Sequence, residues 1–348
     1  MTSNGRCAIT ASDKLRVGVI GAGYWGPNLI RNFALVPDAA VTGVADAKPE
    51  RRAFIAPRFP TVKVFASAEE LIRWDQTDAV VIATPVHTHF PLAKAALEAG
   101  RHVLLEKPMC ASVAECDRLI ELAEKKGLTL MVDHTFLYTG AVRKIVALVA
   151  GGEIGEVLYF DSVRVNLGLF QHDVNVLWDL APHDLSIMDA VMGPGAEAVS
   201  ALGRAHLGTH VENIAYMTVM FNHGAIAHFH VNWLAPVKVR TTLIGGSRRM
   251  IVYDDTEPSE KVKIYDKGVD VATDVEKVHR TLVQYRTGDM HAPKIDDTEA
   301  LLLVAREFAD SIREKRAPLT DAHAGRRVVA VLEAANKSLT QEGRLVRL

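Results

Sequence analysis

Glu106-Lys107-Pro108 places a lysine directly after a strand predicted over residues 102–105. Because Pro108 disfavours helical backbone at the residue before it, the Lys107 side chain is expected to extend from the end of that strand. An ammonium group in such a position can stabilise an alkoxide or polarise a carbonyl group. The structural alternative is a surface ion pair between Glu106 and Lys107.

A second motif, residues 178–184 (Trp-Asp-Leu-Ala-Pro-His-Asp), pairs a carboxylate with an imidazole. Asp179 and His183 are four residues apart, a spacing that stacks two side chains on one face of a helix. A carboxylate beside a histidine can orient or charge the ring, which can then act as a general base toward a hydroxyl. Since proline is disfavoured inside helices, Pro182 predicts that the helix begins near it, with Asp179 in the preceding turn. An N-cap aspartate and a structural histidine are the alternative.

A glycine-rich segment, residues 21–26 (Gly-Ala-Gly-Tyr-Trp-Gly), follows a predicted apolar strand and opens a helix. In that context the first glycine permits a tight turn, the second admits a pyrophosphate, and the third lets helix and strand pack closely. Amide groups at the helix N-terminus then face the phosphates. A structural glycine turn is the alternative. The residues of this segment predicted to bind a dinucleotide are Gly21, Gly23, Tyr24, Trp25 and Gly26.

Asp46 ends the next predicted strand, residues 40–45. A carboxylate there hydrogen-bonds an adenosine ribose and repels a 2′-phosphate, which favours NAD over NADP. Lys48, Arg51 and Arg52 follow and weaken that preference. A plain turn residue is the alternative for Asp46.

Residues 84–89 follow a continuous apolar run, residues 79–83, which predicts a strand buried on both faces. Because ligands of open parallel sheets bind at the carboxyl ends of the strands, these residues are expected to face the coenzyme. A helix-capping turn is the alternative for the two histidines, and no third metal ligand stands near them, so zinc is not expected. The predicted coenzyme contacts at these strand ends are Thr84, Pro85, His87, His89, Glu106 and Lys107.

The chain divides in two by pattern. Residues 14–135 alternate strands and helices, which predicts a parallel sheet with helices on both faces, a Rossmann-like coenzyme domain. Residues 136–348 carry longer strands, such as 225–233, where apolar and polar side chains alternate. This part is predicted to be a second domain, in which one face of a sheet packs on a core and the other faces water, substrate or a partner subunit. Residues 1–13 are predicted to be a disordered tail.

The composition excludes several classes of protein. The 348 residues include 40 Lys+Arg and 42 Asp+Glu, and this balance argues against a nucleic-acid partner. No apolar run approaches the ~20 residues of a spanning helix, so no membrane partner is expected. Three cysteines without a Cys-x-x-Cys pair predict a cytoplasmic protein without disulfides.

In this order and spacing, the motifs resemble those of the Gfo/Idh/MocA oxidoreductases, the family of glucose–fructose oxidoreductase and inositol dehydrogenase. The resemblance covers residues 15–348. It implies that residues 14–135 form an NAD-binding Rossmann domain. It also implies that residues 136–348 form an α/β domain for substrate binding and oligomerisation, with a large, mostly antiparallel sheet and final helices that return to the first domain. Dimers or tetramers would form through the open face of that sheet. It also implies that Lys107, Asp179 and His183 are catalytic, with the hydroxyl proton passing to His183 or Lys107 while hydride passes to the nicotinamide.

Residues 23–28 and 178–184 are similar to one branch of this family. That branch oxidises the C3 hydroxyl of a UDP-linked N-acetyl hexosamine or its uronic acid. On this basis the predicted substrate contacts are Lys107, Arg164, Asn166, Asp179 and His183, with Phe136, Tyr138 and Arg143 as candidates for ring contacts. Core packing explains the two aromatic residues equally well. The alternatives are an inositol or free-sugar dehydrogenase, an NAD-dependent glycosidase, and a non-catalytic coenzyme sensor.

Overall fold

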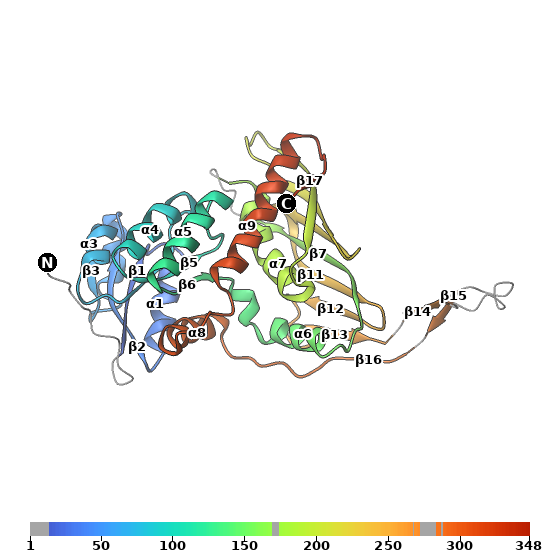
Figure 1. Ribbon diagram of the computed structural model, residues 1–348, viewed down its shortest axis with the longest axis horizontal. Helices are drawn as coiled ribbons and strands as arrows, with labels where there is room; N and C mark the ends of the chain where they lie inside the picture. The colour runs from blue at the N-terminus through green and yellow to red at the C-terminus, as the bar shows by residue number, and fades with distance from the viewer. Residues whose placement is uncertain (1–13, 169–173, 267, 272–282, 287) are drawn as a thin grey trace. The chain divides into compact units, whose positions relative to one another are not determined.

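The computed structural model describes residues 14–168, 174–266, 268–271, 283–286 and 288–348. The predicted tail, residues 1–13, lies outside these ranges. The chain forms two compact units, Met1–Tyr138 with Thr298–Val329, and Thr139–Asp297 with Ala330–Leu348 (Figure 1). Each unit is described by itself.

The first unit is built on a six-stranded parallel sheet in the order β3-β2-β1-β4-β5-β6. The order reverses between β1 and β4, and ligands of open parallel sheets bind outside the carboxyl ends of the strands at such a reversal. The predicted doubly wound fold is therefore confirmed. The strands are β1 (Leu15–Ile20), β2 (Ala39–Ala45), β3 (Lys63–Phe65), β4 (Ala79–Ile82), β5 (His102–Glu106) and β6 (Leu130–Asp133).

Helices cover both faces of this sheet, which is why every residue of β4 is buried. Helices α1 (Gly26–Ala34) and α8 (Ala300–Glu314) pack together on one face. The other face is covered by α3 (Ala68–Arg73), α4 (His89–Glu98) and α5 (Val113–Lys126). Shorter elements are α2 (Pro49–Ile55), η1 (Val86–Thr88) and η2 (Thr135–Tyr138).

The second unit contains a nine-stranded sheet in the order β16-β13-β12-β11-β7-β10-β9-β8-β17. Only β7 and β10 pair in parallel, so the sheet is mostly antiparallel, as predicted. Two further strands, β14 (Gly268–Val271) and β15 (Val283–Arg286), pair with each other. The nine strands are β7 (Val157–Leu167), β8 (Ala196–Arg204), β9 (Ile214–Phe221), β10 (Ile226–Asn232), β11 (Leu234–Gly246), β12 (Met250–Asp254), β13 (Val262–Tyr265), β16 (Met290–His291) and β17 (Val346–Arg347).

The two faces of this sheet differ in character. Helix α7 (Val176–Met192) packs on β7, β9 and β10, where the alternate residues Ala227, Phe229 and Val231 are buried. The opposite face of β10 is exposed or half-buried, which confirms the predicted alternation. The remaining helices are α6 (Gly140–Ala150), which packs on α7, and α9 (Ala322–Thr340). Within the described ranges, every helix is too short or too polar to cross a bilayer.

Helix α7 begins earlier than the sequence predicts. It starts at Val176, after an Asn175 side chain that accepts a hydrogen bond from the Trp178 amide, and Pro182 lies inside it. The predicted start near Pro182 is therefore wrong. The N-cap at Asn175 and the burial of one side of the helix on the sheet outweigh the hydrogen bond that the proline removes.

Candidate active site

The glycine loop after β1 needs its glycines for different reasons. Gly21 has φ +96°, and a Cβ at this position would collide with the carbonyl oxygen of Ala83. A Cβ at Gly26 would collide with the carbonyl oxygen of Gly21. A Cβ at Gly23 would meet no heavy atom within 4 Å. Gly21 and Gly26 therefore allow the turn and the close packing, whereas Gly23 leaves open the space that a pyrophosphate requires.

Asp46 ties the end of β2 to this loop. One carboxylate oxygen, Oδ2, accepts a hydrogen bond from the Ala22 amide at 2.7 Å, and the other accepts from the Lys48 amide at 2.8 Å. Arg51 holds the same loop from the other side, donating to the carbonyl oxygens of Ala22 at 2.6 Å and Gly23 at 2.5 Å. The loop is thus held in shape by the chain's own groups.

A cavity of about 630 Å³ opens beside this loop at the carboxyl edge of the sheet. The loops that follow β1, β2, β3 and β4 line it, so it lies at the strand reversal where a dinucleotide is expected. Of the predicted coenzyme contacts, it is lined by Gly21, Gly23, Asp46, Thr84 and Pro85. Tyr24, Trp25 and His87 are exposed and are not among its lining residues, so their coenzyme contacts stay predictions.

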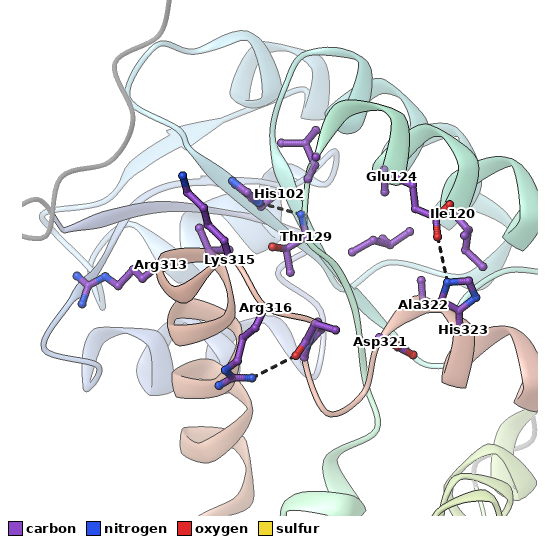
Figure 2. A pocket seen from close by; sticks show the side chains of 17 residues that line it. His102, Ile120, Glu124, Thr129, Arg313, Lys315, Arg316, Asp321, Ala322 and His323 are labelled. Atoms are coloured by element: carbon purple, nitrogen blue, oxygen red, sulfur yellow. Dashed lines mark hydrogen bonds and ion pairs between the residues drawn. The ribbon is translucent and has the colours of Figure 1, made fainter. Parts of the chain in front are cut away.

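A second cavity, of about 670 Å³, lies where β5 and β6 begin, and thus at the opposite edge of the same sheet (Figure 2). Its polar side chains largely bind one another or the backbone. His323 contacts Glu124 at 3.1 Å, and His102 accepts a hydrogen bond from the Thr129 amide at 3.0 Å. The glycine loop, Asp46 and Lys107 all follow strand ends at the carboxyl edge, so this cavity is not the coenzyme site.

Lys107 follows β5 beside a pair of carboxyl groups. Glu106 and Asp133 face each other in register on β5 and β6, and Asp133 is buried. Burial raises the pKa of both Glu106 and Asp133, while the Lys107 ammonium lowers both. The charge of Lys107 therefore acts on both carboxyl groups.

His134 follows Asp133 and was not singled out by the sequence motifs. Both of its ring nitrogens are buried without a hydrogen-bond partner among the described residues, as is Oδ2 of Asp133. Burial lowers the pKa of His134 to about 3, so the ring is neutral. Buried polar atoms of this kind usually have a hydrogen-bond partner, so this pair marks a polar position at the end of β6. The only sequence signal was two polar residues ending an apolar strand.

His89 is also buried, at 1% exposure, although it was predicted to touch the coenzyme. Its Nε2 lies 2.8 Å from the carbonyl oxygen of Thr84, and its Nδ1 lies 3.0 Å from that of Pro108. The ring therefore sits between the loop after β4 and the loop after β5. Both ring nitrogens already face protein carbonyl groups, and burial lowers the pKa of the ring.

Asp179 and His183 lie on α7, one turn apart, as their spacing predicts. Asp179 Oδ2 accepts a hydrogen bond from Nε1 of Trp233 at 2.9 Å, and Trp233 is fully buried. The indole therefore fixes the carboxylate, a contact that the sequence motifs did not reveal. Both Asp179 and His183 remain partly accessible.

Arg164 does not present a free guanidinium to a substrate. It is 3% exposed and binds Asp184 through two hydrogen bonds, from Nε at 2.8 Å and from Nη2 at 2.7 Å. This buried ion pair joins β7 to α7. Asn166, two residues further along β7, is half-buried, and its substrate contact stays a prediction.

The proposed ring-contact residues have other partners. The Tyr138 hydroxyl is buried 3.1 Å from the Thr320 hydroxyl, which favours core packing for this residue. Arg143 pairs with Asp296 at 3.3 Å on the surface.

Comparison with known families agrees with this geometry in both units. Residues 15–134 match the model of an oxidoreductase family with an NAD-binding Rossmann fold, and residues 142–252 match the GFO/IDH/MocA C-terminal domain. The chain belongs to the GFO/IDH/MocA family. The family model over residues 15–134 describes oxidoreductases with an NAD-binding Rossmann fold, so the predicted coenzyme and enzyme class are confirmed.

Several GFO/IDH/MocA relatives align with most or half of the chain. The UDP-N-acetylglucosamine 3-dehydrogenase of Acidithiobacillus ferrooxidans is 28% identical over 91% of this chain and 94% of its own. The dTDP-3,4-didehydro-2,6-dideoxy-alpha-D-glucose 3-reductase of Streptomyces antibioticus is 26% identical over 90% of this chain and 93% of its own. The myo-inositol 2-dehydrogenase of Thermotoga maritima is 28% identical over 54% of this chain and 58% of its own.

Solved structures of the family share the fold. The structure of the A. ferrooxidans enzyme superposes with a TM-score of 0.79 at 26% identity, covering 94% of this chain and 98% of the other. GenD2 from gentamicin A biosynthesis, in complex with NAD, superposes with a TM-score of 0.81 at 24% identity and 99% coverage of both chains.

Proposed function

We propose that this protein transfers hydride from C3 of a nucleotide-linked sugar to NAD, with a UDP-N-acetyl hexosamine or its uronic acid as the substrate. The observation that carries the proposal is the pair of relatives that span at least 90% of the chain. One is named for dehydrogenation and the other for reduction, and both act at position 3 of a nucleotide-linked sugar. The position and the nucleotide carrier are what they share.

Oxidation of a ring hydroxyl removes a hydride from carbon and a proton from oxygen. NAD, when bound, accepts the hydride. His183, held on α7, accepts the hydroxyl proton as a general base. The Lys107 ammonium stabilises negative charge that develops on the same oxygen. In the alternative that the sequence left open, Lys107 accepts the hydroxyl proton in place of His183.

Asp179 orients the substrate or the imidazole. Its carboxylate is itself held by the Trp233 indole, so its direction does not depend on solvent. A group whose geometry is held in advance loses less free energy on reaching the transition state.

The coenzyme is held by residues at the carboxyl edge of the first unit. We propose contacts from the cavity-lining Gly21, Gly23, Asp46, Thr84 and Pro85. The Asp46 carboxylate disfavours a 2′-phosphate, so NAD is preferred over NADP.

The deciding experiment follows reduced nicotinamide by absorbance in a single turnover. Stoichiometric enzyme and NAD are mixed separately with UDP-N-acetylglucosamine, its uronic acid, free glucose and myo-inositol. We expect reduction with a UDP-sugar only. The Lys107→Ala and His183→Ala variants are expected to slow this reduction to a small residual rate while retaining NAD binding by calorimetry.

Reduction with myo-inositol only would instead support the second candidate, an inositol dehydrogenase, which the T. maritima relative favours. Full activity in either alanine variant would refute the catalytic assignment of that residue.

A further inference from the structure

Two loops at the carboxyl edge of the first unit carry different parts of the site. The loop after β4 contributes Thr84 and Pro85 to the coenzyme cavity. The loop after β5 carries Lys107 and Pro108. Strands β4 and β5 are neighbours, but their backbone pairing ends at Ile82 and Leu105, before either loop begins. The strand ladder therefore does not fix the position of one loop relative to the other.

His89 supplies a connection between these loops. As the first residue of α4, it is anchored by a helix that packs on β4 and β5. Its two ring nitrogens lie 2.8 Å from the Thr84 carbonyl oxygen and 3.0 Å from the Pro108 carbonyl oxygen. A carbonyl oxygen can only accept a hydrogen bond, and a neutral imidazole carries a single N–H. The ring therefore donates to one of the two carbonyl oxygens and packs against the other from the same rigid plane.

Burial makes this connection matter. His89 is 1% exposed, so water does not replace the ring at either carbonyl. Phenylalanine matches the ring in size but offers no donor. Glutamine keeps a donor but does not extend in both directions from a rigid plane.

We propose that His89 is a positioning residue that sets Lys107 relative to the loop holding the coenzyme. The ring acts through the two carbonyl groups and contacts neither substrate nor coenzyme. The Lys107 part of the inference rests on the proposed catalytic role of that residue, whereas the Thr84 part rests only on NAD binding.

The experiment compares His89→Phe and His89→Gln with a matched control, His102→Phe. His102 is the first residue of β5 and is half-buried. Like His89 it hydrogen-bonds the backbone, but it lies at the end of β5 opposite to Lys107. Calorimetry measures the affinity for NAD, and thermal unfolding measures stability. Single-turnover absorbance measures hydride transfer, with the substrate from which the wild-type enzyme reduces NAD.

We expect His89→Phe to raise the Kd for NAD by about fivefold and to slow hydride transfer by about tenfold, because a buried hydrogen bond is lost and a carbonyl oxygen is left without its donor. His89→Gln should lie between this variant and the wild type. His102→Phe should lower the unfolding temperature while both functional values stay within about twofold of the wild type.

A double-mutant cycle separates this inference from the proposed function. If His89 acts through Lys107, adding His89→Phe to Lys107→Ala should slow hydride transfer by less than about twofold further. Fully additive effects would overturn the Lys107 part, and so would an unimpaired Lys107→Ala enzyme, which would also refute the proposed role of the lysine. An unchanged Kd for NAD in both His89 variants would overturn the Thr84 part, whatever the catalytic result.

Discussion

Trp233 shows how a single side chain outside the catalytic motifs can govern one inside them. Its indole nitrogen donates to Asp179 Oδ2 at 2.9 Å from a fully buried position. The hydrogen bond limits the rotation of the carboxylate. An aspartate that orients a substrate or an imidazole needs a fixed direction.

Trp233→Phe removes this donor and is expected to lower kcat by about tenfold, because a hydrogen bond to a charged group contributes about 1.5 kcal/mol or more. The Kd for NAD should not change, since the residues lining the coenzyme cavity all belong to the first unit. Steady-state kinetics and calorimetry measure the two values.

Phe229→Leu is the matched control for Trp233→Phe. Phe229 is as deeply buried in the same unit, and its aromatic partner is Phe160. The control should cost stability and leave kcat near the wild-type value. Equal losses of kcat in the two variants would show that general loosening of the core, and not the hydrogen bond to Asp179, accounts for the effect.

At the scale of elements, the Arg164–Asp184 ion pair joins strand β7 to helix α7. Because α7 carries Asp179 and His183, this pair anchors the helix that presents both side chains. Two charges taken out of water are tolerable when they are fully paired, but the loss of one partner leaves a buried charge alone.

Arg164→Met is therefore expected to lower the free energy of unfolding by about 3–5 kcal/mol. The double variant, Arg164→Met with Asp184→Leu, should lower it by much less, because no buried charge is left unpaired. Urea unfolding followed by tryptophan fluorescence measures both. A stable Arg164→Met enzyme with weakened substrate binding would contradict this structural role and restore the substrate contact predicted from the sequence.

His102, the first residue of β5, makes a different contribution. Burial lowers its pKa to about 4, and the ring accepts the Thr129 amide hydrogen only while its Nδ1 is unprotonated. Between pH 6.5 and about 4 the unfolded chain binds a proton at this residue and the folded chain does not. Stability therefore falls as the pH falls through this window.

A decrease from pH 7 to pH 5 should destabilise the wild type by about 2 kcal/mol more than His102→Gln, since each pKa unit corresponds to about 1.4 kcal/mol. Urea unfolding at both pH values gives the difference, in which the other titrating groups largely cancel. An equal pH dependence in the two proteins would show that His102 titrates normally in the folded state.

At the scale of the whole molecule, one face of the nine-stranded sheet stands out. Adjacent strands place large apolar side chains on it at 37–51% exposure, in a cluster of Tyr159, Leu202, Tyr216, Met220 and Ile226. Contiguous apolar patches of this kind mark interaction surfaces. The family resemblance of the sequence implied dimers or tetramers formed through this face, and we propose on both grounds that a second copy of the chain covers it.

Ile226→Glu places a charge within this cluster and is expected to shift the protein toward a smaller species in size-exclusion chromatography with light scattering. Leu35→Glu, at 54% exposure in the first unit, is the control and should leave the mass unchanged. A monomeric wild type, or a variant that keeps the wild-type mass, would reject this face as the interface.

The sequence by itself determined the features that depend on neighbouring residues. Local geometry is enough to interpret four of them: the glycines of a tight turn, the aspartate that ends a strand, the lysine before a proline, and the i, i+4 pair. Together they predicted the parallel sheet, the coenzyme loop and the positions of Lys107, Asp179 and His183 in the chain. Alternation along residues 225–233 likewise predicted which face of the second sheet is buried.

Only the tertiary structure decided which side chains are buried and which distant residues meet. His89 and Pro108, Glu106 and Asp133, Arg164 and Asp184, and Asp179 and Trp233 are separated by 19 to 54 residues, so strand order and register bring them together. Burial then changed their chemistry by shifting a pKa, requiring a partner or withdrawing a guanidinium from solvent. Pro182 illustrates the same limit, because a local rule predicted a helix start where packing and an earlier N-cap produced a continuous helix.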